Sequence, residues 1–252
     1  MAGKMNIKQL QNKKGREKIV MLTAYDQPIA KLLDGAGLDV VLVGDSLGNV
    51  ALGYRNTLPV TMDEMVIHVQ AVARGVEKAL IVADLPFGSY QIEPKEAVRS
   101  AVRLIKAGAD AVKLEGAEHL DAVRQIIKAG IPVMGHLGFT PQSVKLLGYK
   151  VQGKEKSSAA KILADAKLLE KAGCFALVIE LVPEELGAKI SKALKIPAIG
   201  IGAGPKVDGQ VLVTNDLIGL FDSPPSFVKP RANVAGVILQ AVQGFIKEVK
   251  DV

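Results

Sequence analysis

The sequence has no tryptophan, a single cysteine and only 4% aromatic residues. One cysteine, Cys174, cannot form an internal disulfide or supply a multi-thiolate zinc or iron–sulfur site, which disfavours a secreted disulfide scaffold and a structural zinc domain. No apolar run reaches the roughly 18 residues that cross a bilayer, and residues 1–14 are polar and basic. We therefore expect no membrane span and a cytoplasmic protein.

Positive charge exceeds negative charge, with 32 basic and 26 acidic side chains and a formal net charge of +6. Sites that bind nucleic acid usually combine clustered Lys and Arg with aromatic stacking groups, whereas here the lysines are scattered and aromatics are few. The excess charge therefore indicates mainly solubility, and no nucleic-acid partner is expected. With 49% hydrophobic and 23% charged residues among 252, the composition is that of a globular protein.

Short β-rich apolar runs alternate with helical patterns along the chain, without a Pro/Gly/Ser-rich linker between them. The predicted strands are residues 19–24, 39–44, 79–83, 111–114, 132–135, 175–179 and 198–201, with a weaker eighth at 211–214. Several helices are predicted to end in an Ala-Gly pair, where glycine takes the left-handed conformation; these glycines are Gly37, Gly108, Gly130 and Gly173.

Seven or eight such βα units in about 250 residues match a (β/α)₈ TIM barrel. We therefore expect one α/β barrel domain over residues 1–252. A doubly wound open sheet is the alternative. Polar residues follow many consecutive strands, which favours the barrel, because an open sheet gathers its ligands at one switch point.

Acidic residues end three successive predicted strands. Asp45 and Asp84 follow apolar strands, and the two-residue period of the next strand places Lys113 and Glu115 on one face. Each carboxylate could instead cap a helix or form a buried ion pair. Together at one barrel mouth, three carboxylates repel one another and favour a bound cation. Oxygen ligands favour Mg²⁺ first and Mn²⁺ second.

Further polar candidates end the later strands. Glu180 is a candidate proton acceptor, or a carboxylate capping the helix that starts near Pro183. Lys113 could face an anionic substrate or pair with Glu115. His136 could contact a ligand or be an ordinary satisfied histidine. The basic stretch 145–156 could cover the barrel mouth as a lid.

Seven segments in fixed order resemble a known family. They are residues 23–26 (TAYD), 43–48 (VGDSLG), 57–61 (TLPVT), 83–87 (ADLPF), 112–116 (VKLEG), 135–138 (GHLG) and 200–204 (GIGAG). Together they resemble the ketopantoate hydroxymethyltransferase family over nearly the whole chain. The resemblance implies a barrel of the phosphoenolpyruvate/pyruvate type, assembled as a homodecamer, with one Mg²⁺ per subunit.

The resemblance also implies an activity and roles for the candidates. The expected reaction transfers a hydroxymethyl group from 5,10-methylenetetrahydrofolate to 3-methyl-2-oxobutanoate through a Mg²⁺-stabilised enolate, giving 2-dehydropantoate (ketopantoate) for pantothenate and coenzyme A synthesis. The implied residues are Asp45, Asp84 and Glu115 for the metal; Asp45, Ser46, Asp84, Lys113 and His136 for the 2-oxo acid; and Glu180 as proton acceptor. The alternative is another Mg²⁺-dependent 2-oxo acid lyase or mutase of the same superfamily. The sequence identifies no folate pocket.

Overall fold

The computed structural model describes residues 3–221 and 224–251. Of these, the residues up to Val211 form one compact unit and those from Leu212 onward form another. The expectation of a single domain over residues 1–252 stays a prediction. In the described part of the chain, no helix is both long enough and apolar enough to cross a membrane.

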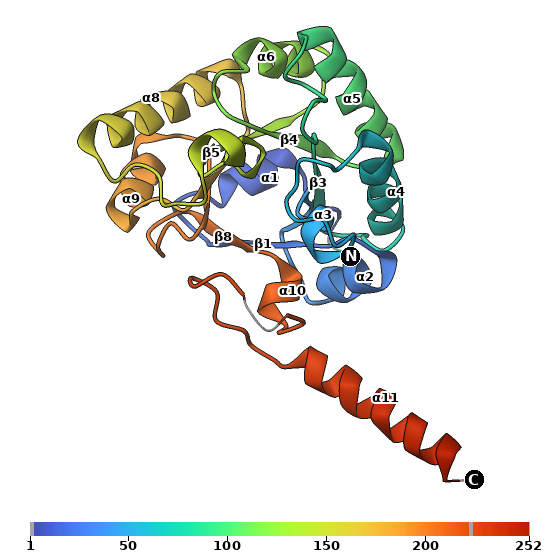
Figure 1. Cartoon of the computed structure of the whole chain (residues 1–252). Coiled ribbons are helices and arrows are strands. Elements are labelled where there is room, and N and C mark those ends of the chain that lie inside the picture. Colours follow the sequence, from blue (N-terminus) through green and yellow to red (C-terminus); the bar gives the residue numbers. More distant parts are fainter. Residues whose placement is uncertain (1–2, 222–223, 252) are drawn as a thin grey trace. The chain divides into compact units, whose positions relative to one another are not determined.

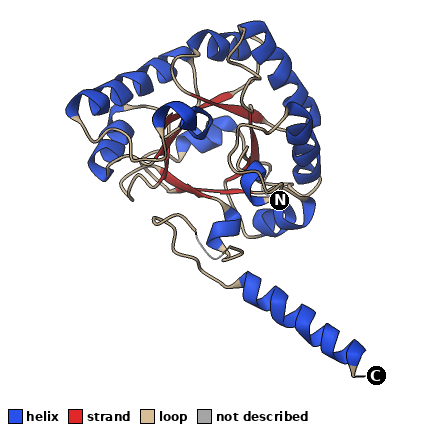
Figure 2. Ribbon diagram, in the orientation of Figure 1, coloured by secondary structure: helices blue, strands red, loops and turns tan. Residues whose placement is uncertain are grey.

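Eight parallel strands close into a barrel in sequential order (Figure 1). The strands are β1 (Ile19–Thr23), β2 (Val40–Val43), β3 (Leu80–Asp84), β4 (Ala111–Glu115), β5 (Val133–Gly138), β6 (Ala176–Glu180), β7 (Ala198–Ile201) and β8 (Gly209–Leu212). Figure 2 shows these strands as an inner ring surrounded by most of the helices. The predicted (β/α)₈ barrel is therefore confirmed.

Helices precede β1 and follow each strand from β1 to β6, whereas β7 continues to β8 without a helix. These helices are α1 (Ile7–Asn12), α2 (Gln27–Gly35), α3 (Leu47–Val50), α4 (Met62–Ala73), α5 (Pro94–Ala107), α6 (Leu120–Lys128), the 3₁₀ turn η1 (Pro141–Ser143), α7 (Val144–Leu147), α8 (Lys156–Ala172) and α9 (Glu184–Ala193). The second unit contains α10 (Thr214–Leu217) and α11 (Val234–Lys250). Thr61 and Glu64 form a reciprocal capping box at the start of α4.

The predicted helix ends agree with the structure, and seven predicted strands overlap the observed ones, although β5 runs to Gly138, three residues beyond its predicted end. The four glycines of the Ala-Gly pairs all have positive φ. The eighth strand lies at Gly209–Leu212 rather than at 211–214, because the backbone of Asp208 already bonds to Ile19 of β1 and Thr214 begins α10. A Cβ at Gly209 would overlap the backbone of Ile19, so the barrel closes through a glycine that interrupts the apolar pattern.

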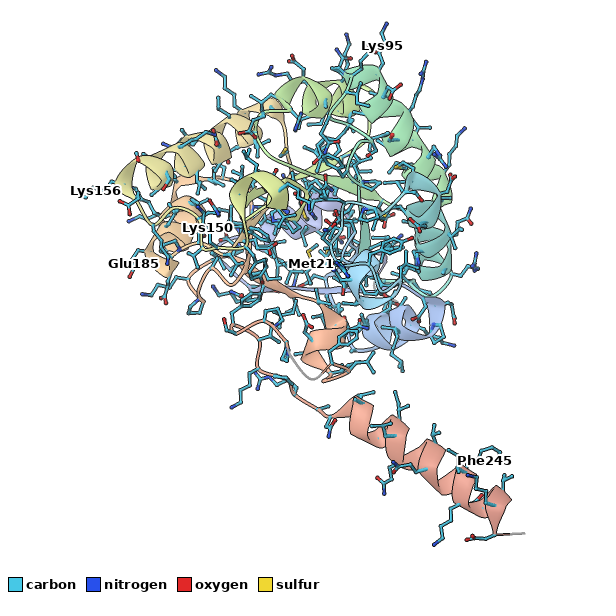
Figure 3. The ribbon with its side chains drawn as sticks, viewed as in Figure 1. Met21, Lys95, Lys150, Lys156, Glu185 and Phe245 are labelled. Carbon is cyan, nitrogen blue, oxygen red and sulfur yellow. The ribbon has the colours of Figure 1, made fainter. Side chains whose placement is uncertain are left out.

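The alternation of side chains along the strands links the core to the candidate site. Met21, in the middle of the barrel in Figure 3, belongs to an inner apolar cluster with Val82 and Met134. Asp84 lies two residues beyond Val82 on β3, and His136 lies two residues beyond Met134 on β5. Each therefore shares the face of its strand with that apolar residue. The same alternation on β4 and β6 leads to Lys113, Glu115 and Glu180. The interior of the barrel is thus apolar along most of the strand length and charged at the carboxyl ends of the strands.

Candidate active site

Lys113 and Asp84 form a buried ion pair at the barrel mouth. Asp84 is the register partner of Lys113 on the neighbouring strand, and their Nζ and Oδ1 atoms are 3.0 Å apart. The sequence suggested Glu115 as the alternative partner of Lys113, and this pairing is wrong because strand register places Asp84 beside it. Burial lowers the pKa of Lys113, but the carboxylates of Asp84, Glu115 and Asp45 outweigh burial and raise it, so the ammonium stays charged.

Asp45 and Asp84 are buried beside each other. The Asp45 backbone N–H donates to Asp84 Oδ2 at 3.1 Å. Burial raises the pKa of Asp45 well above its usual value, and the charges of Asp84 and Glu115 raise it further. Burial also raises the pKa of Asp84, against the opposing charge of Lys113. Lys113 alone does not offset the burial and mutual repulsion of these carboxyl groups, and a bound cation would supply further positive charge.

Gln142 connects two of the carboxylates and was missed by the sequence reasoning. Its backbone N–H donates to Glu115 Oε2 at 3.0 Å, and its side-chain Nε2 donates to Asp45 Oδ2 at 2.8 Å. Its Oε1 accepts from the Tyr90 hydroxyl at 2.7 Å and from Gln91 Nε2 at 3.0 Å. Gln142 carries no charge and does not titrate, so its residue type did not mark it as a candidate. Its only sequence signal was its position four residues beyond the end of β5.

His136 lies between two carboxylates. Its Nε2 is 3.2 Å from Glu180 Oε2, and its Nδ1 is 3.4 Å from Glu115 Oε1 and 3.3 Å from Lys113 Nζ. Burial and Lys113 both lower the pKa of His136, but the two carboxylates outweigh them and raise it to about 9. His136 therefore connects the predicted base to the metal candidates, an arrangement that sequence position alone did not show.

The backbone around Glu180 is held in an unusual conformation. Leu181, the next residue, has φ 46°, a left-handed conformation that is costly for a branched apolar residue. Gly138, the register partner of Glu180 on β5, has φ 96°, and a Cβ there would overlap the Glu180 carbonyl oxygen. The Glu180 side chain is 14% exposed. Its position at the mouth thus depends on a glycine in the neighbouring strand.

Ser46 lies at the start of α3 and makes a hydrogen bond to a buried tyrosine. Its Oγ is 2.8 Å from the hydroxyl of Tyr25. Burial raises the pKa of Tyr25, so this phenol stays neutral. The Tyr25 carbonyl in turn bonds to Nδ1 of His68 at 2.6 Å. Ser46 is therefore fixed beside Asp45 on the same mouth.

The donor set of the mouth fits a hard divalent cation. Asp84 Oδ1 lies 3.0 Å from Lys113 Nζ, and Glu115 Oε1 lies 3.4 Å from His136 Nδ1. Neither of these buried oxygens accepts a hydrogen bond of regular geometry among the described residues, so each can still take a cation. In residues 3–221 and 224–251, no three His, Cys, Asp or Glu side chains already converge as a metal site. Mg²⁺ commonly binds through one or two carboxylates, with water and substrate completing its shell, so full convergence is not required. Ligation by Asp45, Asp84 and Glu115 stays a prediction.

Comparison with known proteins identifies the family. The sequence model for "Ketopantoate hydroxymethyltransferase" matches residues 4–252. The chain belongs to this family. It is 52% identical to the 3-methyl-2-oxobutanoate hydroxymethyltransferase of Pyrococcus furiosus, over 97% of this chain and 87% of that protein. It is 54% identical to the protein of the same name from Thermotoga maritima, over 98% and 92% of the two chains. The enzyme is a hydroxymethyltransferase, and the resemblance of its ordered segments is confirmed.

Solved structures similar to the enzyme have the same barrel. A phosphonopyruvate hydrolase in complex with oxalate and Mg²⁺ has a TM-score of 0.66 at 13% identity, covering 98% of this chain and 87% of that one. A phosphoenolpyruvate phosphomutase from Streptomyces platensis subsp. rosaceus has a TM-score of 0.67 at 14% identity, covering 98% and 88%. At this identity the likeness shows the fold alone, a TIM barrel, and the phosphoenolpyruvate/pyruvate type stays a prediction.

Proposed function

We propose that this enzyme transfers a hydroxymethyl group from 5,10-methylenetetrahydrofolate to 3-methyl-2-oxobutanoate, giving ketopantoate. The observation that carries the proposal is the buried mouth where Lys113, three carboxylates and the His136–Glu180 pair meet. The names of relatives more than 50% identical over almost the whole chain support the substrate.

The side chains divide the chemistry among them. Lys113 faces the anionic oxo acid, and the Ser46 hydroxyl offers it a hydrogen bond. A bound Mg²⁺, held by Asp45, Asp84 and Glu115, would polarise the keto oxygen and make the adjacent C–H more acidic. Glu180 accepts the proton from C3, and its contact with His136 fixes the direction of its carboxylate. The C3 electron pair then bonds to the one-carbon unit, and water supplies the hydroxyl group. Both C–N bonds of that unit break, and tetrahydrofolate leaves with the proton from C3 and the second proton of water on its two nitrogens.

Glu180→Gln tests the proposed base. Purified enzyme with Mg²⁺ and 3-methyl-2-oxobutanoate is expected to exchange the C3 hydrogen with deuterated water, as followed by NMR. Removing a general base costs about 10²–10⁴-fold in rate, so the variant should show that loss in exchange. Glu185→Gln is the matched control, because Glu185 lies exposed on the outer side of α9 (Figure 3). Undiminished exchange in Glu180→Gln would exclude Glu180 as the base.

Product analysis separates the transferase from a lyase or mutase of the same superfamily. The latter has only the shared barrel in its favour. A transferase consumes methylenetetrahydrofolate and forms ketopantoate in equal amounts. Cleavage or rearrangement of a 2-oxo acid without folate consumption would overturn the proposal.

We also propose that the enzyme is located in the cytoplasm.

The proposed assembly is a homo-oligomer, with the decamer as its expected size. The apolar side chains of α11 support self-association, because every turn of this helix exposes some of them. They are Val237, Ile238, Leu239, Val242, Phe245, Ile246 and Val249. Exposed apolar surface of this extent is typical of protein interfaces. Light scattering coupled to size exclusion measures the oligomer, and a monomer would contradict this part of the proposal.

A further inference from the structure

A cavity of about 460 Å³ lies beside the catalytic mouth. Its walls come from the segments that follow β3, β4 and β5 and from one side of α8. Glu115 and Gln142 form part of its lining and also belong to the carboxylate network. A ligand in this cavity therefore reaches the reacting centre without crossing the protein. The volume falls within the range of small-molecule sites, about 300–1,000 Å³.

The outer walls of the cavity are apolar and exposed. Phe87 is 49% exposed and Leu146, on α7, is 87% exposed, although both line the cavity. Deeper inside, the rings of Tyr90 and His119 meet edge to face with centroids 5.2 Å apart. Apolar area left in water is unfavourable, so a ligand that covers Phe87 and Leu146 gains affinity from them. A flat ring with two apolar faces fits between such walls.

Charged side chains also line this cavity. Glu118 and Asp165 both lie close to Lys161, whose Nζ is 3.3 Å from Glu118 Oε1 and 2.5 Å from Asp165 Oδ2. Asp165 has the closer contact with Lys161, whereas Glu118 has the longer one and its side chain, which lines the cavity, is 65% exposed. A carboxylate pairs well with two adjacent N–H donors, as on the edge of an aminopyrimidinone ring. Lys161, 63% exposed, suits the anionic tail of the same molecule.

We propose that this cavity binds the reduced pterin of the folate donor, with Phe87 and Leu146 covering the ring and Glu118 pairing with its amino edge. This inference rests on the proposed function, since it names the place of the cosubstrate for that reaction. The donor's one-carbon unit then lies toward Glu115 and Gln142, where the oxo acid is activated. The stretch 145–156 takes part through Leu146 and Gln152, which line the cavity.

Kinetics of two half-reactions test the cavity. Phe87→Ala, Leu146→Ala and Glu118→Gln are compared for C3–H exchange, which needs no folate, and for ketopantoate formation at varied methylenetetrahydrofolate. If the ring stacks on Phe87, Phe87→Ala should raise the KM for methylenetetrahydrofolate about tenfold. The rate of C3–H exchange should change much less. Leu32→Ala, which truncates an exposed leucine on α2 outside the cavity, is the control.

Titration calorimetry with tetrahydrofolate distinguishes failure of the site from failure of the reaction. Wild-type enzyme should bind it, and Phe87→Ala and Glu118→Gln should each weaken binding about tenfold while circular dichroism shows the folded spectrum. Unchanged binding and unchanged folate KM in Phe87→Ala and Leu146→Ala would overturn the inference. Tetrahydrofolate binding that depends on these side chains, in an enzyme that forms no ketopantoate, would support the cavity and overturn the proposed reaction instead.

Discussion

Removal of the Gln142 side chain should weaken metal binding more than it weakens the fold. The carboxamide donates to Asp45 Oδ2 at 2.8 Å and to the Leu85 carbonyl at 2.9 Å, and it accepts from Tyr90 and Gln91. A hydrogen bond to a charged group contributes about 1.5–3 kcal/mol, and partners that orient metal ligands are worth about 10–100-fold in affinity. Gln142→Ala should therefore bind Mg²⁺ or Mn²⁺ about 10–100-fold more weakly.

Gln142→Ala tests the role of Asp45 separately from that of Glu115, the other proposed metal ligand that Gln142 contacts. The backbone N–H of residue 142 remains in the alanine variant and can still donate to Glu115 Oε2. The assay is calorimetric titration with Mg²⁺, together with electron paramagnetic resonance of bound Mn²⁺. Gln70→Ala, at an exposed position of α4, is the matched control.

Equal metal affinity in wild type and Gln142→Ala, with the fold intact by circular dichroism, would refute this reasoning. It would mean that Gln142 does not position Asp45, or that Asp45 does not hold the metal. Repeating the titration with Asp45→Asn separates these two outcomes. A loss in Asp45→Asn alone would remove only the positioning role of Gln142.

Three further predictions concern the scaffold. Gly138→Ala should displace Glu180, because a Cβ would overlap its carbonyl oxygen at a positive φ; we expect a loss of stability above about 1 kcal/mol and slower C3–H exchange. Thr61→Ala should cost about 1 kcal/mol in urea unfolding, because it removes the capping box of α4. Asp34→Asn should reduce stability at neutral pH but not in strong acid. Burial raises the pKa of Asp34, but N–H donors from residues 77–79 outweigh burial and hold it below 3.8.

The sign of the Asp34 effect follows from its lowered pKa. The stabilisation is complete above the usual value of 3.8 and is lost as the pH falls through the lower folded value. Urea unfolding of wild type and variant between pH 7 and pH 2 measures the difference, which should shrink only below about pH 4. A constant difference across this range would contradict the assignment. For Gly138→Ala, an unchanged melting temperature and exchange rate would show that the barrel absorbs the added methyl group.

Local side-chain periods were enough to predict much of the barrel. The two-residue period of a strand fixes which residues share a face, so Lys113 and Glu115 were placed together from the sequence. The Ala-Gly pairs marked helix ends, since glycine alone takes the left-handed conformation readily. The eighth strand was displaced because its position depends on contact with β1, almost 200 residues earlier in the chain.

Contacts between distant segments determined the rest of the site. Strand register paired Lys113 with Asp84 and placed Glu180 opposite Gly138, from where its carboxylate lies 3.2 Å from His136 Nε2. The path of the loop after β5 brought Gln142 against two carboxylates and shaped the neighbouring cavity. The sequence by itself determined the alternation of strands and helices and the charged ends of the strands, because these follow from local periodicity. Tertiary structure decided which charges meet, because register and loop paths depend on packing between residues far apart in the chain.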